Sequence, residues 1–181
     1  AKQLCHQYNQ LSPDQKSERK QVLKKLLPHV VNPHIEPNFA CDFGNNIIAP
    51  YGLYLNHNVT ILDGAAIRFG HSVLVGPGAV ITATTHPKDT DLRRSGEEWI
   101  APITIGDDVW VGANATILRN VTIGDNVVIG AGAVVTKNIQ SNCVVRGVPA
   151  RVLRRLEGNI TDDRKTVGIG VPPLTPRSES S

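Results

Sequence analysis

One histidine of this sequence stands where it could move a proton. His86 directly precedes Pro87 in the polar segment TTHPKDTDLRRSGEEWIAP, residues 84–102. An imidazole titrates near neutral pH and can act as a general base, which typically accelerates a reaction ~10²–10⁴-fold. A single loop histidine is more often an ordinary surface residue, so the catalytic hypothesis depends on the residues around it.

The cysteines are not arranged as nucleophiles or as metal ligands. Cys5, Cys41 and Cys143 are odd in number, widely spaced and without a CxxC motif. Cys41 and Cys143 have no histidine nearby and are interpreted as small core residues. We therefore expect neither a disulfide scaffold nor a zinc cluster, and a reducing, cytoplasmic compartment. No serine has a nucleophile context either, so a reaction at His86 would be direct, without a covalent enzyme intermediate.

Composition excludes several classes of protein. The 181 residues suffice for one domain with a short appendage, and the formal charge of only +3 gives no argument for nucleic acid or for an anionic membrane. No stretch approaches the ~18 apolar residues of a membrane span. Aromatic residues make up 4%, so the core must be aliphatic, and 16 Gly with 12 Pro favour a turn-rich β architecture.

A repeat of six residues runs through the middle of the chain. Aliphatic residues fall at this spacing, several of them followed by glycine: Ile105, Val111, Ile117, Ile123, Ile129 and Val135. Two shorter runs precede them: Phe69, Val75 and Ile81, and, shifted by two residues, Phe43, Ala49, Leu55, Ile61 and Ile67. Period six describes a strand of about four residues and a two-residue corner, three of which form one triangular coil. Coils of this kind stack through parallel strands, with one aliphatic side chain per strand pointing inward.

The repeat is interrupted once and is flanked by different segments. Between Ile81 and Ile103 the polar residues 84–102 are predicted to form a loop extruded from the coil, where function is often placed. Residues 1–30 are helical in character, with a predicted helix start at Ser12-Pro13 and an end at Pro28. We predict an N-terminal helical segment at 1–30, a β-helix domain at 31–156 and a disordered tail at 157–181.

Five segments together resemble a known family. They are CDFGNNI (41–47), ATTHPKD (83–89), ITIGDDVWVGANATI (103–117), VTIGDNVVIGAGAVVTK (121–137) and VVRGVPARVLRRL (144–156). The chain resembles the hexapeptide-repeat acyltransferases with a left-handed parallel β-helix, and among them the maltose, galactoside and nodulation O-acetyltransferases. The helical CHQYNQL segment at 5–11 is similar to the second half of the family's N-terminal region, so we expect the sequence to begin inside that region.

The resemblance implies a reaction and the residues that would bind the acceptor, which we call the acceptor side of the site. It implies an O-acetyltransferase that moves an acetyl group from acetyl-CoA to a sugar hydroxyl, without a metal and with His86 as general base. Asn56 and Asp42 match acceptor positions, and Glu97 would orient His86 or bind the sugar, with its neighbour Glu98 left open. Gly64 is a departure, because galactoside-type relatives often carry an acidic residue there.

The resemblance also implies a donor side. Residues matching the groove for the pantetheine arm and the nucleotide end of acetyl-CoA are Ala113, Ala131, Thr136, Lys137, Arg151 and Arg154. We predict a short C-terminal helix in the last of the five segments, on which the two arginines would share one face. Trp110 is expected to point outward, toward a groove or a subunit contact. Backbone N–H groups near Ala113 would stabilise the oxyanion. The family's trimer, with sites between subunits, is carried over as an expectation.

Alternatives remain open at this stage. A zinc hydratase of the γ-carbonic-anhydrase type shares the scaffold but needs convergent histidines, whereas His57, His71 and His86 lie 14 and 15 residues apart. A non-catalytic trimeric scaffold would retain the coil without activity. The acceptor could instead be an antibiotic hydroxyl or serine, although the CHQYNQL and GEEWIAP segments favour a sugar.

Overall fold

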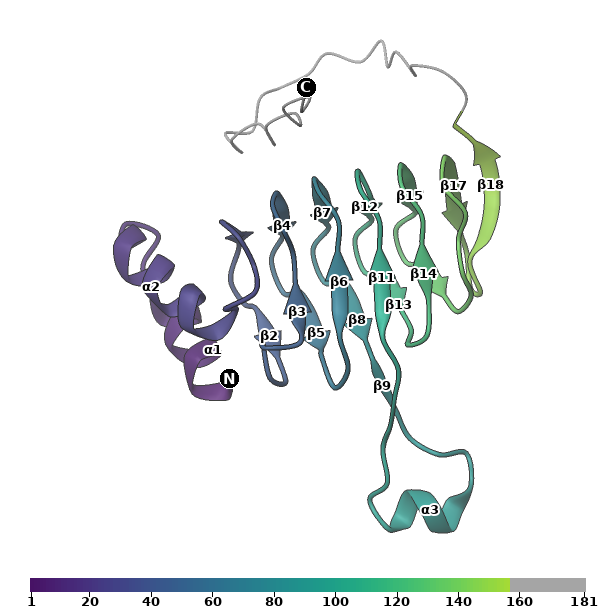
Figure 1. Cartoon of the computed structure of the whole chain (residues 1–181), viewed down its shortest axis with the longest axis horizontal. Helices are drawn as coiled ribbons and strands as arrows, with labels where there is room; N and C mark the ends of the chain where they lie inside the picture. Colours follow the sequence, from purple (N-terminus) through teal and green to yellow (C-terminus); the bar gives the residue numbers. More distant parts are fainter. Residues whose placement is uncertain (157–181) are drawn as a thin grey trace.

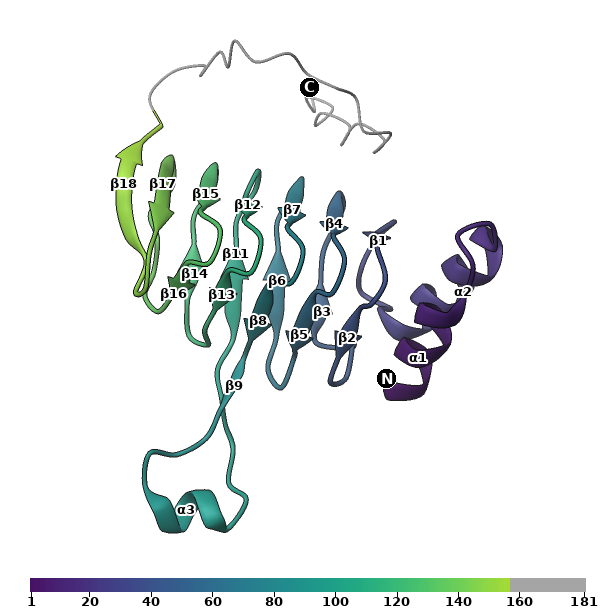
Figure 2. The same cartoon turned by 180° about the vertical axis from the view of Figure 1, so that it is seen from behind.

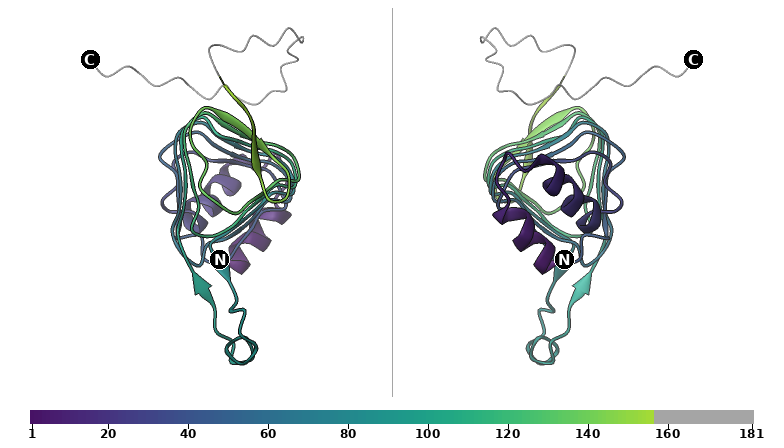
Figure 3. Two further views of the ribbon diagram at one scale, coloured as in Figure 1. Left: turned by 90° about the vertical axis from the view of Figure 1, so that its right-hand side faces the viewer. Right: turned by 90° about the vertical axis from the view of Figure 1, so that its left-hand side faces the viewer.

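The protein is a stack of parallel coils with helices at one end and a hairpin projecting from its side (Figures 1 and 2). The computed structural model describes residues 1–156, and the predicted tail at 157–181 lies outside the described residues. In cross-section the coils form a triangle (Figure 3). The expected parallel β-helix is therefore confirmed. In the described part of the chain, no helix is long and apolar enough to cross a bilayer.

Two helices cover the N-terminal end of the stack. They are α1 (Lys2–Gln10) and α2 (Lys16–Leu26), and the apolar face of α2, which includes Val22, Leu23 and Leu26, is buried. The predicted helix start at Ser12-Pro13 is wrong by three residues. Ser12 donates its backbone N–H to the Gln15 side chain (3.0 Å) and accepts the Gln15 N–H (3.0 Å), which makes a turn between the helices.

Three sheets form the sides of the triangle. The seven-stranded sheet contains β1 (His34–Ile35), β4 (Leu53–Leu55), β7 (Val73–Val75), β12 (Trp110–Val111), β15 (Val127–Ile129), β17 (Cys143–Arg146) and β18 (Arg151–Arg155). The five-stranded sheet contains β2 (Ala40–Cys41), β5 (Thr60–Leu62), β8 (Val80–Thr82), β13 (Thr116–Ile117) and β16 (Val134–Val135). The four-stranded sheet contains β3 (Ile47–Ile48), β6 (Ile67–Phe69), β11 (Ile103–Ile105) and β14 (Thr122–Ile123).

The inward residues of the repeat stack on one another as the period predicts. Along the seven-stranded sheet the register aligns five buried residues, namely Leu55, Val75, Val111, Ile129 and Val145. Asparagines at the corners take positive φ, as at Asn114 (55°) and Asn126 (52°), a conformation that asparagine tolerates better than most residues. The core is thus a column of aliphatic side chains with polar corners.

Phe43 departs from the predicted repeat. Its spacing predicts an inward side chain, but it is 60% exposed. Cys41 takes the inward position in β2 instead. The backbone N–H groups of Asp42 and Phe43 both donate to the Asp63 carboxylate (3.0 and 2.9 Å), so the chain turns at this point and Phe43 faces outward.

The segment 84–102 leaves the stack as predicted, and it has secondary structure of its own. Strands β9 (Thr84–Thr85) and β10 (Trp99–Ile100) pair antiparallel, and α3 (Thr90–Arg94) lies at the tip (Figure 1). The Asp89 carboxylate accepts the N–H groups of Asp91 and Leu92, both at 3.0 Å, and so caps α3. The projection is therefore a two-stranded sheet with a capped helix at its tip.

The predicted short C-terminal helix is wrong. Residues Arg151–Arg155 form β18, which pairs antiparallel with β17. β17 is the last strand of the parallel stack, and an unpaired edge would leave its N–H and C=O groups without partners. The chain reverses at 147–150, where Gly147 has φ +94°, and returns along that edge. The helical argument that Arg151 and Arg154 share a face therefore no longer applies.

Candidate active site

His86 follows β9 at the base of the hairpin, and its ring is held on one side. Its Nδ1 lies 3.2 Å from the main-chain carbonyl oxygen of Glu97, and its Nε2 lies 3.8 Å from the carboxylate of Glu98. A carbonyl oxygen can only accept, so in this hydrogen bond Nδ1 donates the proton. In the neutral imidazole Nε2 then carries the lone pair, and the side chain is 55% exposed.

A groove of about 480 Å³ lies beside this histidine. Its walls come from the hairpin and from two later turns of the coil, and the lining residues include His86, Trp99, Leu118, Arg119, Asn120 and Thr136. A larger groove of about 760 Å³ lies between the helices and the first coil, but it contains none of the predicted site residues. We therefore take the smaller groove as the candidate site.

Several predicted residues lie along the corner of the prism from which the hairpin projects. This hairpin corner consists of the turns that join the five-stranded to the four-stranded sheet: 42–46, 63–66, 83–102, 118–121 and 136–138. Asp42, His86, Thr136 and Lys137 all lie along this corner, with Asp42 on the first coil and Lys137 on the last, and of the four His86 and Thr136 line the groove. Burial raises the pKa of Asp42, and the charges of Asp63 and Glu98 raise it further. Glu98 is therefore close enough to interact with both His86 and Asp42.

Other predicted residues lie at a different corner. This second corner joins the seven-stranded to the five-stranded sheet and includes Asn56, Ala113 and Ala131. The Asn56 side-chain oxygen accepts the backbone N–H of His57 at 2.7 Å. Trp110 lies on the outer face of the seven-stranded sheet and is 54% exposed. One chain does not bring these residues together with His86.

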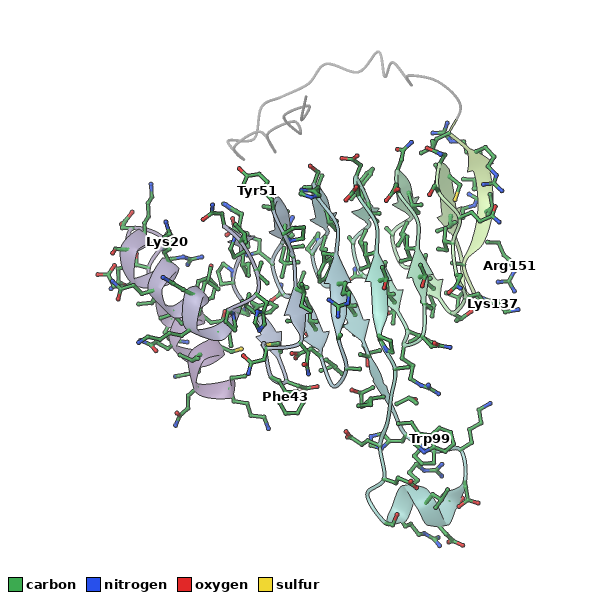
Figure 4. The ribbon with its side chains drawn as sticks, viewed as in Figure 1. Lys20, Phe43, Tyr51, Trp99, Lys137 and Arg151 are labelled. Atoms are coloured by element: carbon green, nitrogen blue, oxygen red, sulfur yellow. The ribbon has the colours of Figure 1, made fainter. Side chains whose placement is uncertain are left out.

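The residues expected to bind acetyl-CoA fit its chemistry. Lys137 and Arg151 lie at the C-terminal end of the stack (Figure 4), and neither they nor Arg154 form a salt bridge within residues 1–156. Arg151 pairs in register with Arg146, so two like charges lie side by side where an anion would be favourable. Ala131 is exposed, and no atom lies within 4 Å of the Cβ position of Gly132, which leaves an open surface.

Sequence reasoning missed Asp63. This residue is 0% exposed, and its carboxylate accepts the backbone N–H groups of Asp42, Phe43, Gly44 and Asn46 at 2.7–3.3 Å. It therefore holds the turn that carries Asp42. A signal was present, because Asp63 stands two residues after the inward Ile61 and so shares its side of the strand.

The structure also distinguishes the two adjacent glutamates. Glu97 contacts His86 through its main chain, whereas Glu98 offers its carboxylate. One buried hydroxyl at the hairpin base, Thr84 Oγ1, has no hydrogen-bond partner among the described residues. Within residues 1–156, no three His, Cys, Asp or Glu side chains gather as a metal site would require.

Fold and site together define a β-helical acyltransferase, and comparison with known proteins supports this class. The family model for the bacterial transferase hexapeptide (six repeats) matches residues 102–137, and that for the maltose acetyltransferase hexapeptide capping motif matches residues 1–30. The galactoside O-acetyltransferase of Escherichia coli (strain K12) is 40% identical over 156 residues, which cover 86% of this chain and 77% of that protein.

Solved structures agree. The maltose O-acetyltransferase from Clostridium difficile 630 superimposes with a TM-score of 0.83 at 39% identity, covering 87% of this chain and 84% of that one. A hexapeptide-repeat acetyltransferase from Vibrio cholerae, solved with acetyl-CoA, gives a TM-score of 0.82 at 37% identity, covering 86% and 85%. The chain belongs to the galactoside and maltose O-acetyltransferase family, and it is an acyltransferase with acetyl-CoA as co-substrate.

Proposed function

We propose that this protein acetylates a hydroxyl group of a sugar, with His86 as the general base. The observation that supports the proposal is the hydrogen bond from His86 Nδ1 to the Glu97 carbonyl (3.2 Å), because in the neutral imidazole it places the proton on Nδ1 and the lone pair on Nε2, beside the groove. A base needs a free lone pair and an open approach, and His86 has both. A sugar is preferred as acceptor because the similar proteins include a galactoside and a maltose O-acetyltransferase.

The protein groups then act in a simple order. Acetyl-CoA, when bound, supplies the acetyl thioester. His86 Nε2 accepts the proton of the acceptor hydroxyl as its oxygen attacks the thioester carbonyl. The Glu98 carboxylate, 3.8 Å from Nε2, stabilises the imidazolium that forms. No cysteine faces His86, so the transfer is direct, and the proton returns from His86 to the departing thiolate.

Each remaining predicted residue has a role in this proposal. Asp42 and Asn56 bind acceptor hydroxyls, while Glu97 orients His86 through its carbonyl oxygen. The arm of acetyl-CoA lies along Ala113 and Ala131, with Thr136, Lys137, Arg151 and Arg154 near its polar end. Trp110 forms a wall of the groove in the assembled protein.

We further propose that the working form is a homotrimer. His86 and Asp42 lie at the hairpin corner, whereas Asn56, Ala113 and Ala131 lie at the second corner of the same prism. A single coil cannot bring two of its own corners together, but the corner of a neighbouring subunit can meet them. A trimer built this way holds three sites, each composed of two chains.

Acetyl-CoA turnover tests the function. Free-thiol release is measured over a panel of maltose, glucose, galactosides, serine and chloramphenicol, for the wild type, His86→Ala and Glu97→Gln. We expect sugar-dependent release that falls roughly 10²–10⁴-fold in His86→Ala. Glu97→Gln is the matched control and stays within about twofold, because it keeps the carbonyl that holds Nδ1.

The panel also separates the alternatives. Release with serine or chloramphenicol but with no sugar would overturn the sugar assignment and keep the general base. Equal rates for the wild type and His86→Ala would overturn the role of His86. Absence of release with any acceptor, together with loss of coenzyme A binding, would favour a non-catalytic scaffold.

A further inference from the structure

Two buried thiols face each other where α1 meets the first coil. Cys5 on α1 and Cys41 in β2 have their Sγ atoms 3.7 Å apart, and the residues are 7% and 6% exposed. The third cysteine, Cys143, is buried at the other end of the stack and donates to the Gln140 carbonyl (3.1 Å). Only one pair of cysteines in residues 1–156 is therefore in position to react together.

We propose that Cys5 and Cys41 form a reversible disulfide when a low-molecular-weight disulfide such as oxidised glutathione is present, and that this bond changes the acceptor side of the active site. The step is balanced. The Cys5 thiolate attacks one sulfur of glutathione disulfide and releases one glutathione, and the Cys41 thiolate then displaces the second. The protein loses two hydrogens, and the small disulfide is reduced to two thiols.

The local chemistry supports Cys5 as the attacking thiol. The hydrogen bond from Cys41 holds the pKa of Cys5 below that of an ordinary thiol, whereas the same bond and burial raise the pKa of Cys41. A thiolate rather than a thiol attacks a disulfide. Cys5 lies on α1, one of the two helices at the end of the stack, and a terminal helix can open locally at a smaller free-energy cost than a central coil. Cys41 is then positioned to resolve the mixed disulfide from inside.

Two contacts hold the pair in place. The Asn9 side chain donates to the Phe39 carbonyl and accepts the Phe39 N–H, both at 2.9 Å, and so fixes α1 beside the start of β2. The backbone N–H of Asp42 donates to buried Asp63 at 3.0 Å. A disulfide needs its sulfur atoms about 2.05 Å apart. Closing the gap from 3.7 Å therefore pulls on the short segment between these anchors.

That segment includes the residue next to Asp42. Cys41 and Asp42 are adjacent, so a movement of Cys41 displaces an acceptor-side carboxylate. Displacements near 1 Å in an active site can reduce a rate ~10²-fold. This consequence rests on the proposed function, whereas formation of the disulfide does not.

The first measurement counts thiols in the full chain. Wild type and Cys143→Ser are equilibrated in glutathione buffers from fully reduced to fully oxidised, quenched with iodoacetamide and weighed by mass spectrometry. We expect two thiols to disappear together, a peptide linking Cys5 to Cys41, and a melting temperature about 5–15 °C higher in the oxidised protein. Three alkylated thiols under every condition, a stable glutathione adduct or a link to Cys143 would overturn the proposal.

The second measurement separates the disulfide from its effect. Wild type, Cys5→Ser and Cys41→Ser are assayed reduced and oxidised with the best acceptor of the panel. We expect kcat/KM for the acceptor to fall at least about tenfold only in oxidised wild type, to recover with dithiothreitol, and to leave the KM for acetyl-CoA unchanged. A disulfide without loss of rate would overturn the effect on Asp42. An enzyme inactive on every acceptor would contradict the proposed function, while the thiol count would still decide the disulfide.

Discussion

At the scale of single residues, two neighbouring glutamates contact His86 through different groups. Glu97 and Glu98 are adjacent, yet the first offers its main-chain carbonyl to His86 and the second its carboxylate. Burial raises the pKa of Asp42, and the charges of Asp63 and of Glu98 raise it further. The charge of Asp42 is therefore unfavourable in the folded protein, as is common for groups kept for function rather than stability.

Asp42→Asn is expected to be more stable than the wild type at neutral pH. Because folding raises the pKa of Asp42, the wild type loses stability as the pH rises through that pKa, and the neutral amide does not. Below the usual pKa of an aspartate, both states of the wild type are protonated and the difference vanishes. Thermal unfolding of both proteins at neutral pH and at about pH 3 checks this. A variant less stable than the wild type at neutral pH would contradict it.

At the scale of elements, the strands at the base of the hairpin pack closely against Gly64, which has no side chain. A Cβ at Gly64 would lie 2.4 Å from Thr84 Oγ1 and 3.0 Å from Ile100 Cγ2, which belong to β9 and β10. These strands end next to His86 and Glu98. Close packing at position 64 therefore decides where the hairpin leaves the coil. The acidic side chain that galactoside-type relatives often carry at this position would need a different packing of β9 and β10.

Gly64→Ala is expected to lower kcat about tenfold or more by displacing the hairpin. Thr84→Ala by itself is expected to be neutral or slightly stabilising, because Oγ1 is buried without a partner. The double variant removes the 2.4 Å contact and should recover most of the lost rate. Kinetics of the four proteins measure the coupling between the two positions. Additive effects would show that Thr84 is not the obstacle.

The turn that carries Asp42 depends in turn on Asp63. Asp63→Asn is expected to lower the free energy of unfolding by roughly 2–4 kcal/mol, because four backbone donors lose a charged acceptor inside the protein. Asp125→Asn is the matched control. That exposed side chain accepts one N–H, from Asp107 at 2.8 Å, and its replacement should cost less than about 1 kcal/mol. Denaturant unfolding compares the two, and equal losses would refute the special role of Asp63.

At the scale of the whole molecule, the prism separates two groups of predicted site residues. The hairpin corner and the second corner lie on different edges of one coil, and the seven-stranded sheet presents an apolar outer stripe. This stripe includes Leu74 and Trp110, which are neighbours in the register of β7 and β12. A large exposed indole on a flat sheet is typical of a contact surface.

Trp110→Arg is expected to convert the proposed trimer to a monomer and to lower activity at least about a hundredfold, because in that proposed trimer each site is composed of two chains. Thr122→Arg is the control, because Thr122 is exposed on the four-stranded sheet and should leave assembly unchanged. Sedimentation velocity measures the mass of each form. A Trp110→Arg trimer with full activity would show that this face is not the interface.

The sequence alone determined the coil, because its period of six is a property of covalent spacing and of which side chains avoid water. It also determined His86 as a candidate, because the motif around it is local. Periodicity predicted the wrong side for Phe43, however. The backbone N–H of Phe43 donates to the Asp63 carboxylate, and this hydrogen bond makes the chain turn so that the side chain points outward. Residues 151–155 were predicted as a helix because the edge of β17 that they pair with exists only after the chain has folded.

Only the tertiary structure could show which residues meet. His86 and Thr136 are 50 positions apart but line one groove, whereas Asn56 and Ala113 lie on another edge. The pairing of Cys5 with Cys41 was equally hidden, because the helix that carries Cys5 packs on β2 through contacts that no spacing rule encodes. The six-residue repeat determines how far along the β-helix axis each residue lies. Packing between helices, hairpin and coil determines which other side chains that residue contacts.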